Sequence, residues 1–314
     1  MGFLKRDRIG LSIGPTHLSI ASVIQRGEGV EVRQGAVEPL ERGVCHPSPV
    51  EKNILQMDRW REAVRSVLGP FRRLRALTLG LPDAAVRTLL LDLQQVPKNR
   101  KDFERLIQWH MEKTFLYPLG DSRFSYQVLA RRQTDVRILA TAVKKEVIEQ
   151  YEMLDGERAI EVRQIAPSSF FAFNLFQPAI VKNVGEKGHF LFVYLLDQSL
   201  TIQIFEGGLL SFIRVKEFPQ KEEEPDQAAE RFFQELGSSL SFYDGAGTRL
   251  QQLTHLFLLT DQAPISERRS QEMFHLTPVL LNPSQILRSI PQPGSDSSEW
   301  AMRLMSAAAA AVGG

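Results

Sequence analysis

The sequence contains a single cysteine, Cys45, among its 314 residues. One thiol cannot close an internal disulfide, and such sparing use of cysteine is typical of proteins from a reducing compartment. The fold must therefore be stabilised by its own core. A chain of this length can bury enough apolar surface for that purpose, and it has room for about two domains.

Long apolar runs are missing as well. No segment approaches the roughly 20 consecutive apolar residues that a helix needs to cross a bilayer. The N-terminal residues, MGFLKRDRIG, lead directly into a predicted strand and do not have the pattern of a signal peptide. We therefore predict a cytoplasmic protein with no membrane span of its own.

The sequence has almost no charge surplus, with 38 Lys and Arg against 37 Asp and Glu. A nucleic-acid-binding protein would need a basic excess concentrated on one face, so we expect no nucleic-acid partner. The six histidines are scattered and do not show the close spacing that places two metal ligands on one helix face. We expect no metal site built from protein side chains.

The N-terminal half alternates between apolar and polar residues. Residues 8–27 predict a strand, a short glycine-containing turn and a second strand, and a third strand is expected near residues 30–32. Alternation with period two and tight glycine turns are typical of antiparallel strands. A helix is predicted at 58–68 with Asp58 as its N-cap, and the segment LRALTLGLP predicts a buried strand.

The C-terminal half repeats this order from residue 189 onward. Three predicted strands (HFLFVYLL, SLTIQIFEGG and LLSFIRVKEF) precede a long helix with an acidic start, which should end near Gly245. The apolar strand HLFLLT follows, and then a helix at 264–273, a strand at 278–281 and a helix at 298–311. The repeat concerns the order of the elements rather than the sequence itself.

Both halves share one pattern if residues 87–160 form an insertion, after which the first half resumes with the strand EVRQIA and a helix. We therefore predict an α/β protein with the actin-like (ribonuclease H-like) duplicated fold, in which two lobes face each other across a nucleotide cleft. The first lobe would comprise 1–86 and 161–186, with 87–160 as the inserted subdomain. The second lobe would comprise 187–314, with its C-terminal helix packed back toward the first lobe. An α/β protein with two unrelated halves is the alternative.

Several segments resemble the PilM family of type IV pilus assembly, whose architecture recurs in the cytoplasmic part of the type II secretion protein GspL. The similarity lies in ERLIQWHMEKTFLYPLGDSRFSYQVL (104–129), ILATAVKKEVIEQYEML (138–154) and RFFQELGSSLSFYDG (231–245). The opening hairpin and GLPDAAVRTLLLDLQQVP belong to it too, so it covers most of the chain. It implies an actin-like fold whose inserted subdomain is placed as in the cell-division protein FtsA.

The resemblance implies a scaffold at the cytoplasmic face of the bacterial inner membrane. Its partner would be a PilN-like single-pass membrane protein, bound through a short N-terminal cytoplasmic tail, together with other proteins of the pilus or secretion platform. The tail would dock in a groove between the first lobe and the inserted subdomain. The candidate wall of this groove is Phe115, Tyr117, Pro118 and Tyr126. The other reading of these side chains is the subdomain's own core.

An actin-type nucleotide site needs an acidic side chain for Mg²⁺, small residues in two hairpins and a glycine pair beside the adenosine. In the first hairpin, Ser12 stands where the family has its acid. Gly14 is retained, but Pro15 removes one N–H donor from the turn. Thr16 and His17 could still offer side-chain donors.

The second hairpin departs from the family in the same way. Tyr194 and Leu196 stand where the family typically has an acid and a glycine. Asp197 and Ser199 lie nearby, as does Thr201. An aspartate in a turn commonly bonds its own backbone, which is the simplest reading of Asp197.

The third place, in LFLLTDQAPI, has no glycine: Thr260, Asp261 and Gln262 occupy the space where a purine would approach the backbone. We therefore expect a degenerate nucleotide cleft, no bound cofactor and no catalytic residue. The main alternative is an active ATPase that binds ATP and Mg²⁺ and uses Asp197 as its carboxylate. A filament-forming actin homologue and a sugar kinase are further alternatives.

Overall fold

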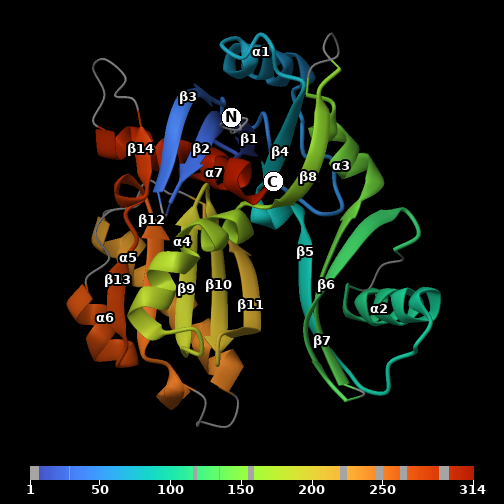
Figure 1. The fold of residues 1–314 in the computed structure, drawn as a ribbon, viewed down its shortest axis with the longest axis vertical. Coiled ribbons are helices and arrows are strands. Elements are labelled where there is room, and N and C mark those ends of the chain that lie inside the picture. Colours follow the sequence, from blue (N-terminus) through green and yellow to red (C-terminus); the bar gives the residue numbers. More distant parts are fainter. Residues whose placement is uncertain are drawn as a thin grey trace, which may run out of the picture.

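The computed structural model describes residues 7–27, 29–115, 119–133, 135–154, 159–219, 225–244, 250–261, 267–289 and 297–314. Two lobes lie one above the other, and a smaller sheet with one helix lies beside them (Figure 1). Each lobe is built on its own sheet, and the two ends of the described chain, Asp7 and Gly314, lie at the same hollow of the first lobe (Figure 1).

The first lobe contains a six-stranded sheet with the order β14-β3-β2-β1-β4-β8. Its strands are β1 (Arg8–Ile13), β2 (His17–Arg26), β3 (Gly29–Pro39), β4 (Ala76–Leu81), β8 (Glu161–Pro167) and β14 (Leu287–Ser289). The first three strands are antiparallel, as the alternation predicts, whereas β1, β4 and β8 are parallel neighbours. β14 comes from the C-terminal part of the chain and pairs in parallel with β3, which the sequence did not indicate.

The second lobe contains a five-stranded sheet with the order β11-β10-β9-β12-β13. Its strands are β9 (Phe190–Leu196), β10 (Ser199–Glu206), β11 (Leu209–Glu217), β12 (His255–Thr260) and β13 (Thr277–Leu280). Three antiparallel strands are again followed by two parallel ones, in the same spatial order as β3-β2-β1-β4-β8. The two lobes therefore repeat one topology, as predicted.

Helices separate and cover the two sheets. α1 (Met57–Leu68) and α3 (Lys145–Glu152) cover the outer face of the six-stranded sheet, and α5 (Pro225–Asp244) covers the outer face of the other, with α6 (Glu267–Phe274) near β13. α4 (Ser168–Val184) and α7 (Ser297–Gly313) lie between the sheets. Short 3₁₀ turns complete the chain at Asp83–Ala85 (η1), Leu250–Gln252 (η2) and Pro283–Gln285 (η3).

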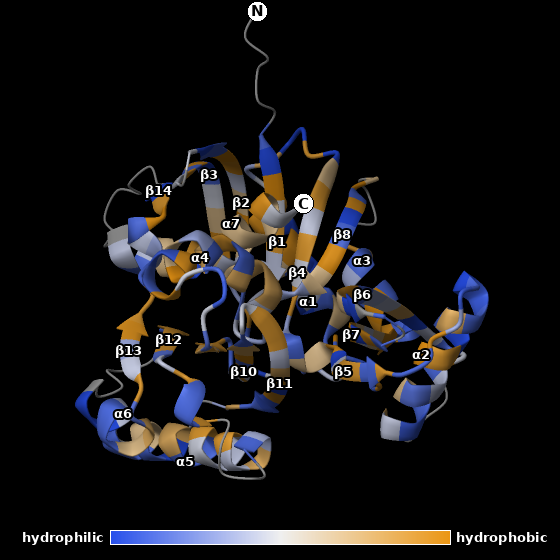
Figure 2. Ribbon diagram, turned by 60° about the horizontal axis from the view of Figure 1, so that its bottom comes forward, coloured by the Kyte–Doolittle hydropathy of each residue, from blue (hydrophilic) through white to orange (hydrophobic). Residues whose placement is uncertain are grey.

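Alternate residues of β9 serve different cores, as period-two patterning requires. Phe190, Phe192 and Tyr194 pack in the core around α4 and α7, whereas Leu191 and Val193 pack in the core beneath α5. Every residue of this strand is buried. Figure 2 shows the corresponding banding on β4 and β8 of the first lobe, where apolar residues alternate with more polar ones.

The alanine run of α7 lets this helix lie very close to the first-lobe sheet. Ala307 through Ala311 are all buried. A methyl group at Gly10 of β1 would lie 2.2 Å from the Ala307 carbonyl oxygen, so the helix backbone contacts the strand backbone directly. Small residues on both sides are what permit this approach.

A third sheet lies beside the lobes and has the order β5-β7-β6. It is built from β5 (Arg87–Leu93), β6 (Ser122–Arg132) and β7 (Asp135–Lys144), and α2 (Arg100–Phe115) packs on one face of it. α3 follows β7 within the segment expected to be inserted, but its Val147 and Tyr151 pack in the core of the first lobe. Tyr151 lies edge-on to Trp60 of α1. We therefore group α3 with the first lobe, between β4 and β8, where α6 stands in the second lobe between β12 and β13.

One local expectation is wrong. α1 begins at Met57, with Gln56 in the N-cap position and no side-chain cap, so Asp58 is not the N-cap. Asp58 lies instead in the first turn, where a negative charge favours the helix dipole. The expected end of the long second-lobe helix at Gly245 lies outside the described residues.

Candidate functional site

The two lobes meet where a hairpin turn from each one faces the crevice between them. The first turn, residues 14–16, joins β1 to β2 and is closed by a hydrogen bond from the Gly14 N–H to the His17 carbonyl oxygen. The second turn joins β9 to β10 through Asp197 and Gln198, which have φ values of 51° and 58°. Positive φ at both central residues is the geometry of a type I′ turn, which suits the twist of a hairpin.

The two turns touch each other directly. The Asp197 Oδ1 atom lies 3.3 Å from the His17 Nδ1 atom. A methyl group added to Gly14 would lie 2.8 Å from the same Asp197 oxygen. The Asp197 carboxylate therefore occupies the space above the first turn, which is where a phosphate held between two such hairpins would have to lie.

Asp197 is nearly buried, with 10% of its side chain exposed. Burial raises its pKa above the ordinary value for an aspartate, and the neighbouring His17 opposes that shift. The contact between the turns has a hollow on each side. Pro15, Thr16, Gln198 and Ser199 take part in lining one of about 560 Å³, and the other, of about 230 Å³, lies toward α7.

A second buried carboxylate joins the lobes below the turns. Asp83 of η1, in the first lobe, is 2% exposed. The Thr201 hydroxyl of β10, in the second lobe, donates to Asp83 Oδ2 at 2.6 Å, and the Ser169 backbone N–H donates to Asp83 Oδ1 at 3.0 Å. Ser169 lies in the first turn of α4, so the helix N-terminus also favours the negative charge.

Burial nevertheless raises the pKa of Asp83, and the hydrogen bonds from Ser169 and Thr201 act in the opposite direction. The nearby Asp197 raises it further. Two carboxylates whose charged forms are both disfavoured thus lie in the same crevice. A buried charge of this kind is tolerated only when hydrogen bonds satisfy it, and Asp83 has them from both lobes.

Hydroxyl groups fill the rest of the crevice wall. Ser12 Oγ lies 3.3 Å from Ser168 Oγ. The position at which an actin-type site needs an acid therefore contributes one hydroxyl of a hydroxyl pair. The Gln203 amide donates to Ser169 Oγ at 3.4 Å, and Tyr194 Oη lies 3.2 Å from Ser306 Oγ of α7. Each of these pairs joins elements that are distant in the sequence.

The third expected place lies at the end of β12. Thr260 is partly buried there, and Asp261 lines the hollow of about 230 Å³ together with His17 and Asp197. Asp261 as a whole residue is exposed, but the protein packed around its carboxyl group, reinforced by the Asp197 charge, raises its pKa to about 6. Gln262 lies outside the described residues.

The structure thus brings most of the expected cleft residues together. Gly14, His17 and Asp197 are in contact, and Thr16 and Ser199 line the larger hollow beside them. Ser12 lies on β1 of the first lobe and Thr260 at the end of β12 of the second lobe, and neither lines the two hollows. Sequence reasoning missed Asp83, whose only signal was an acid placed directly after a buried strand in GLPDAAV. Among the described residues, no three acidic, histidine or cysteine side chains are grouped as a metal site requires.

The expected groove wall is placed differently. Phe115 and Tyr126 are partly buried and pack against the core beneath α2, where Tyr126 lies edge-on to Phe103 with ring centres 5.6 Å apart. Tyr117 and Pro118 lie outside the described residues. For Phe115 and Tyr126 the geometry favours the subdomain core over a docking surface.

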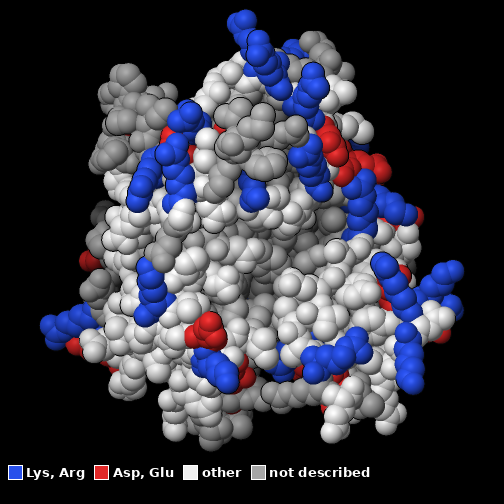
Figure 3. All heavy atoms as spheres, viewed as in Figure 1, with Lys and Arg blue, Asp and Glu red and all other residues white. Residues whose placement is uncertain are grey.

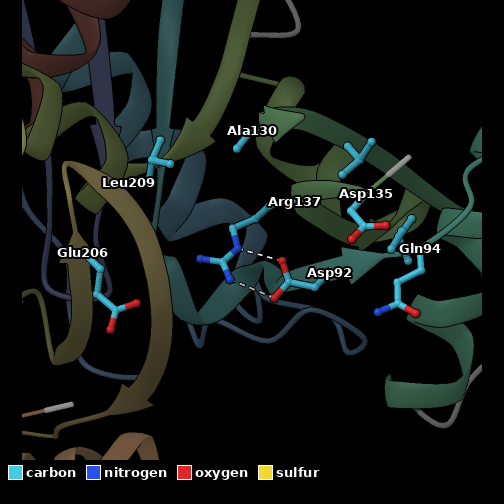
Figure 4. Close-up of a pocket in the computed structure, with 9 residues that line it drawn as sticks. Asp92, Gln94, Ala130, Asp135, Arg137, Glu206 and Leu209 are labelled. Carbon is cyan, nitrogen blue, oxygen red and sulfur yellow. Dashed lines mark hydrogen bonds and ion pairs between the residues drawn. The ribbon is translucent and has the colours of Figure 1, made fainter. Parts of the chain in front are cut away.

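A further hollow, of about 390 Å³, separates the inserted sheet from the second lobe (Figure 4). The Arg137 guanidinium makes two hydrogen bonds to the Asp92 carboxylate, at 2.7 and 2.9 Å, across neighbouring strands. Glu206 and Leu209 face this pair from the end of the second-lobe hairpin (Figure 4). The hollow is acidic overall, because Asp135 lines it as well.

Comparisons with known proteins bear on the fold. No family model matches the chain, and no curated protein matches it. A chain of a PilM-PilN type IV pilus biogenesis complex is similar over 98% of this chain and 97% of its own, with a TM-score of 0.77 and 15% identity. The cytoplasmic domain of EpsL, an inner membrane component of the type II secretion system of Vibrio cholerae, is 12% identical over 96% and 94%, with a TM-score of 0.47.

A Bacteroides thetaiotaomicron protein with an actin-like ATPase fold and unknown function is 10% identical over 95% and 96%, with a TM-score of 0.45. The match to the PilM-PilN complex confirms the predicted actin-like fold and, at the level of the fold, the resemblance to PilM. None of the helices in the described part of the chain combines the length and apolar character that a bilayer crossing requires.

Proposed function

We propose that this protein is an adaptor of a bacterial inner-membrane assembly platform, of the type IV pilus or type II secretion kind, whose actin-like crevice no longer works with nucleotide. The observation that carries the proposal is the Asp197 carboxylate, which lies against Gly14 and His17, between the two turns that would have to hold a phosphate. The fold shared with a chain of the PilM-PilN complex supports the choice of system.

The charges around the turns also support the proposal that nucleotide binding has been lost. Three acidic residues, Asp197, Asp261 and Glu299, line the hollow of about 230 Å³ beside the turns. Arg303 is the one arginine or lysine among the described residues that line it. A triphosphate would have to displace Asp197 and then lie among carboxylates whose own charges already disfavour one another. Magnesium could offset this only through an available anionic ligand. Asp83 already uses its two oxygens to accept hydrogen bonds from Ser169 and Thr201.

The competing function is an actin-like ATPase that binds Mg-ATP and regulates assembly. One observation favours this function: Asp83 and Asp197 are both carboxylates inside the crevice. Titration of the purified protein with a fluorescent ATP analogue in Mg²⁺ separates the two functions, and we expect no saturable binding at micromolar concentration. Competable micromolar binding would overturn the proposal, and phosphate release from ATP that Asp197→Ala abolishes would establish the ATPase.

The proposed partner is a PilN-like single-pass membrane protein, bound through its N-terminal cytoplasmic tail, with other platform proteins beyond it. The hollow of about 560 Å³ suits an extended peptide, because prolines from both lobes and two leucines of the first lobe line it next to the start of the inserted segment. Its apolar lining consists of Pro15, Leu40, Pro47, Leu55, Pro82, Ala84 and Pro219. Such a partner would hold the protein at the cytoplasmic face of the inner membrane.

Co-purification tests this mode of binding. The protein should co-purify with a full-length PilN-like single-pass membrane protein, and deletion of that protein's cytoplasmic tail should abolish the interaction. Leu55, 58% exposed at the hollow, gives the matching variant Leu55→Asp, which should weaken capture. Leu280→Asp is the control, since Leu280 is 47% exposed on β13 and takes no part in the hollow. Undiminished capture after tail deletion would contradict the proposal.

A further inference from the structure

A basic hollow lies at the pole of the first lobe where the described chain begins and ends. It has a volume of about 640 Å³ and is formed at the ends of β1, β2, β4, β8 and α7. Four arginines line it: Arg8, Arg73, Arg75 and Arg163. Basic side chains dominate this end of the molecule in the space-filling view (Figure 3).

The charge of this hollow contrasts with that of the three others described above. Here four arginines stand against one acid, Asp7, whose carboxylate accepts a hydrogen bond from Ser22. Each of the other hollows holds at least as many acids as arginines and lysines among its lining residues. Because the whole chain has a net charge of only +1, this basic face is a local concentration rather than a general surplus.

Two of the arginines are available to bind an anion. Arg73 and Arg75 are exposed on the loop before β4, and within the described residues neither side chain has an ion pair. The other two are held in place: Arg8 donates to the Val312 carbonyl oxygen at 2.9 Å, and Arg163 lies 3.5 Å from Glu161. The rim thus combines oriented and free guanidinium groups around a floor that includes Ile9 and Leu77.

We propose that this face binds the anionic phospholipid headgroups of a bilayer surface. Guanidinium groups suit phosphate because they donate two parallel hydrogen bonds to it. The four arginines surround the hollow and are exposed, so they can contact several headgroups at once. A site for one soluble anion would instead enclose its ligand. No aromatic side chain of the described residues lines the hollow, whereas protein hot spots and single-stranded nucleic-acid sites are usually built on aromatic residues. The proposal does not depend on a membrane partner or on the state of the crevice.

The expected strength is modest. Each arginine near an anionic surface contributes roughly a fivefold gain in affinity, and the effect falls off with ionic strength. Purified protein should therefore sediment with vesicles that contain phosphatidylglycerol but not with pure phosphatidylcholine vesicles, and added salt should release it. Arg73→Glu combined with Arg75→Glu should weaken the binding by at least about 25-fold, because two cations are lost and two anions are gained.

The matched control is Arg100→Glu combined with Arg105→Glu. It makes the same change in net charge with two exposed arginines of α2, on the inserted subdomain. Circular dichroism should show both double variants to be folded, because all four side chains are exposed, and the control should bind phosphatidylglycerol vesicles as the wild type does. Equal vesicle binding by the two double variants would refute the proposal. So would stronger capture by heparin or a poly-glutamate peptide than by the vesicles, or micromolar binding of inorganic phosphate lost in the Arg73/Arg75 variant.

Discussion

Thr201→Val should weaken the attachment of the two lobes in a manner that depends on pH. The Thr201 hydroxyl donates at 2.6 Å to a carboxylate that is 2% exposed, so the bond is short, charge-assisted and shielded from water. Valine preserves the shape of the side chain and removes the donor. Hydrogen bonds to charged groups contribute about 1.5–3 kcal/mol, so we expect the free energy of unfolding to fall by about 2 kcal/mol at pH 8.

The sign of the pH dependence follows from Asp83. Its pKa in the folded protein lies above the ordinary value of 3.8, so the wild type loses part of its stability as the pH rises from 3.8 through the folded pKa. Removal of the Thr201 donor raises the pKa of Asp83 in the folded protein further. The variant therefore continues to lose stability up to a higher pH than the wild type does. The difference between wild type and variant should therefore be smaller near pH 4, where the raised pKa of Asp83 favours the protonated carboxyl group, than at pH 8.

Urea unfolding at both pH values measures this difference. Thr201→Ser is the control, because it keeps the hydroxyl and removes one methyl group, at a cost of about 1 kcal/mol that does not change with pH. An equal loss for Thr201→Val at both pH values, or a valine variant as stable as the wild type at pH 8, would refute the assignment of Asp83 as a charged link between the lobes.

Three further substitutions test the packing and electrostatics around the crevice. Gly14→Ala places a methyl group 2.8 Å from the facing carboxylate and should cost about 1–3 kcal/mol in thermal unfolding, whereas Gly120→Ala, with open space around it, should leave stability unchanged. Gly10→Ala drives a methyl group into the Ala307 carbonyl at 2.2 Å and should cost more than about 3 kcal/mol; a stable variant would contradict the backbone contact of α7 with β1. Asp261→Asn removes a carboxyl group with a pKa of about 6, so it should gain urea stability over the wild type between pH 4 and pH 7; no gain would contradict the raised pKa.

The duplicated architecture could be predicted from the sequence because its strands are strongly patterned. Alternate residues of β9 and β12 serve two different cores, and such strands reveal themselves as short continuous apolar runs. β14 could not be predicted, since it is a three-residue strand whose pairing with β3 depends on the tertiary fold. The membership of α3 could not be predicted for a similar reason, because it depends on tertiary contacts of Val147 and Tyr151 with the first-lobe core.

The crevice was predictable residue by residue but not as a contact. Turn chemistry identified both hairpins, and Asp197 was expected to bond its own backbone, as turn aspartates commonly do. What the sequence could not reveal is that the two turns touch, since Gly14 and Asp197 are brought together by the packing of the lobes. Asp83 was overlooked for the same reason: its partner Thr201 is 118 residues away, and an isolated acid after a strand gives no sign of burial.

Direct contact between the turns leaves little for a crevice ligand to change. A ligand shifts a conformational equilibrium only through its different affinity for the two states. In this protein the lobes already meet through Asp83 and Thr201, through Asp197 and His17, and through the buried α7. A nucleotide that had to separate the turns would break these bonds before it formed its own. Signals that act on the proposed adaptor should therefore enter through its outer surfaces: the hollow beside the inserted segment, where a partner's tail would dock, and the basic face at the pole of the first lobe.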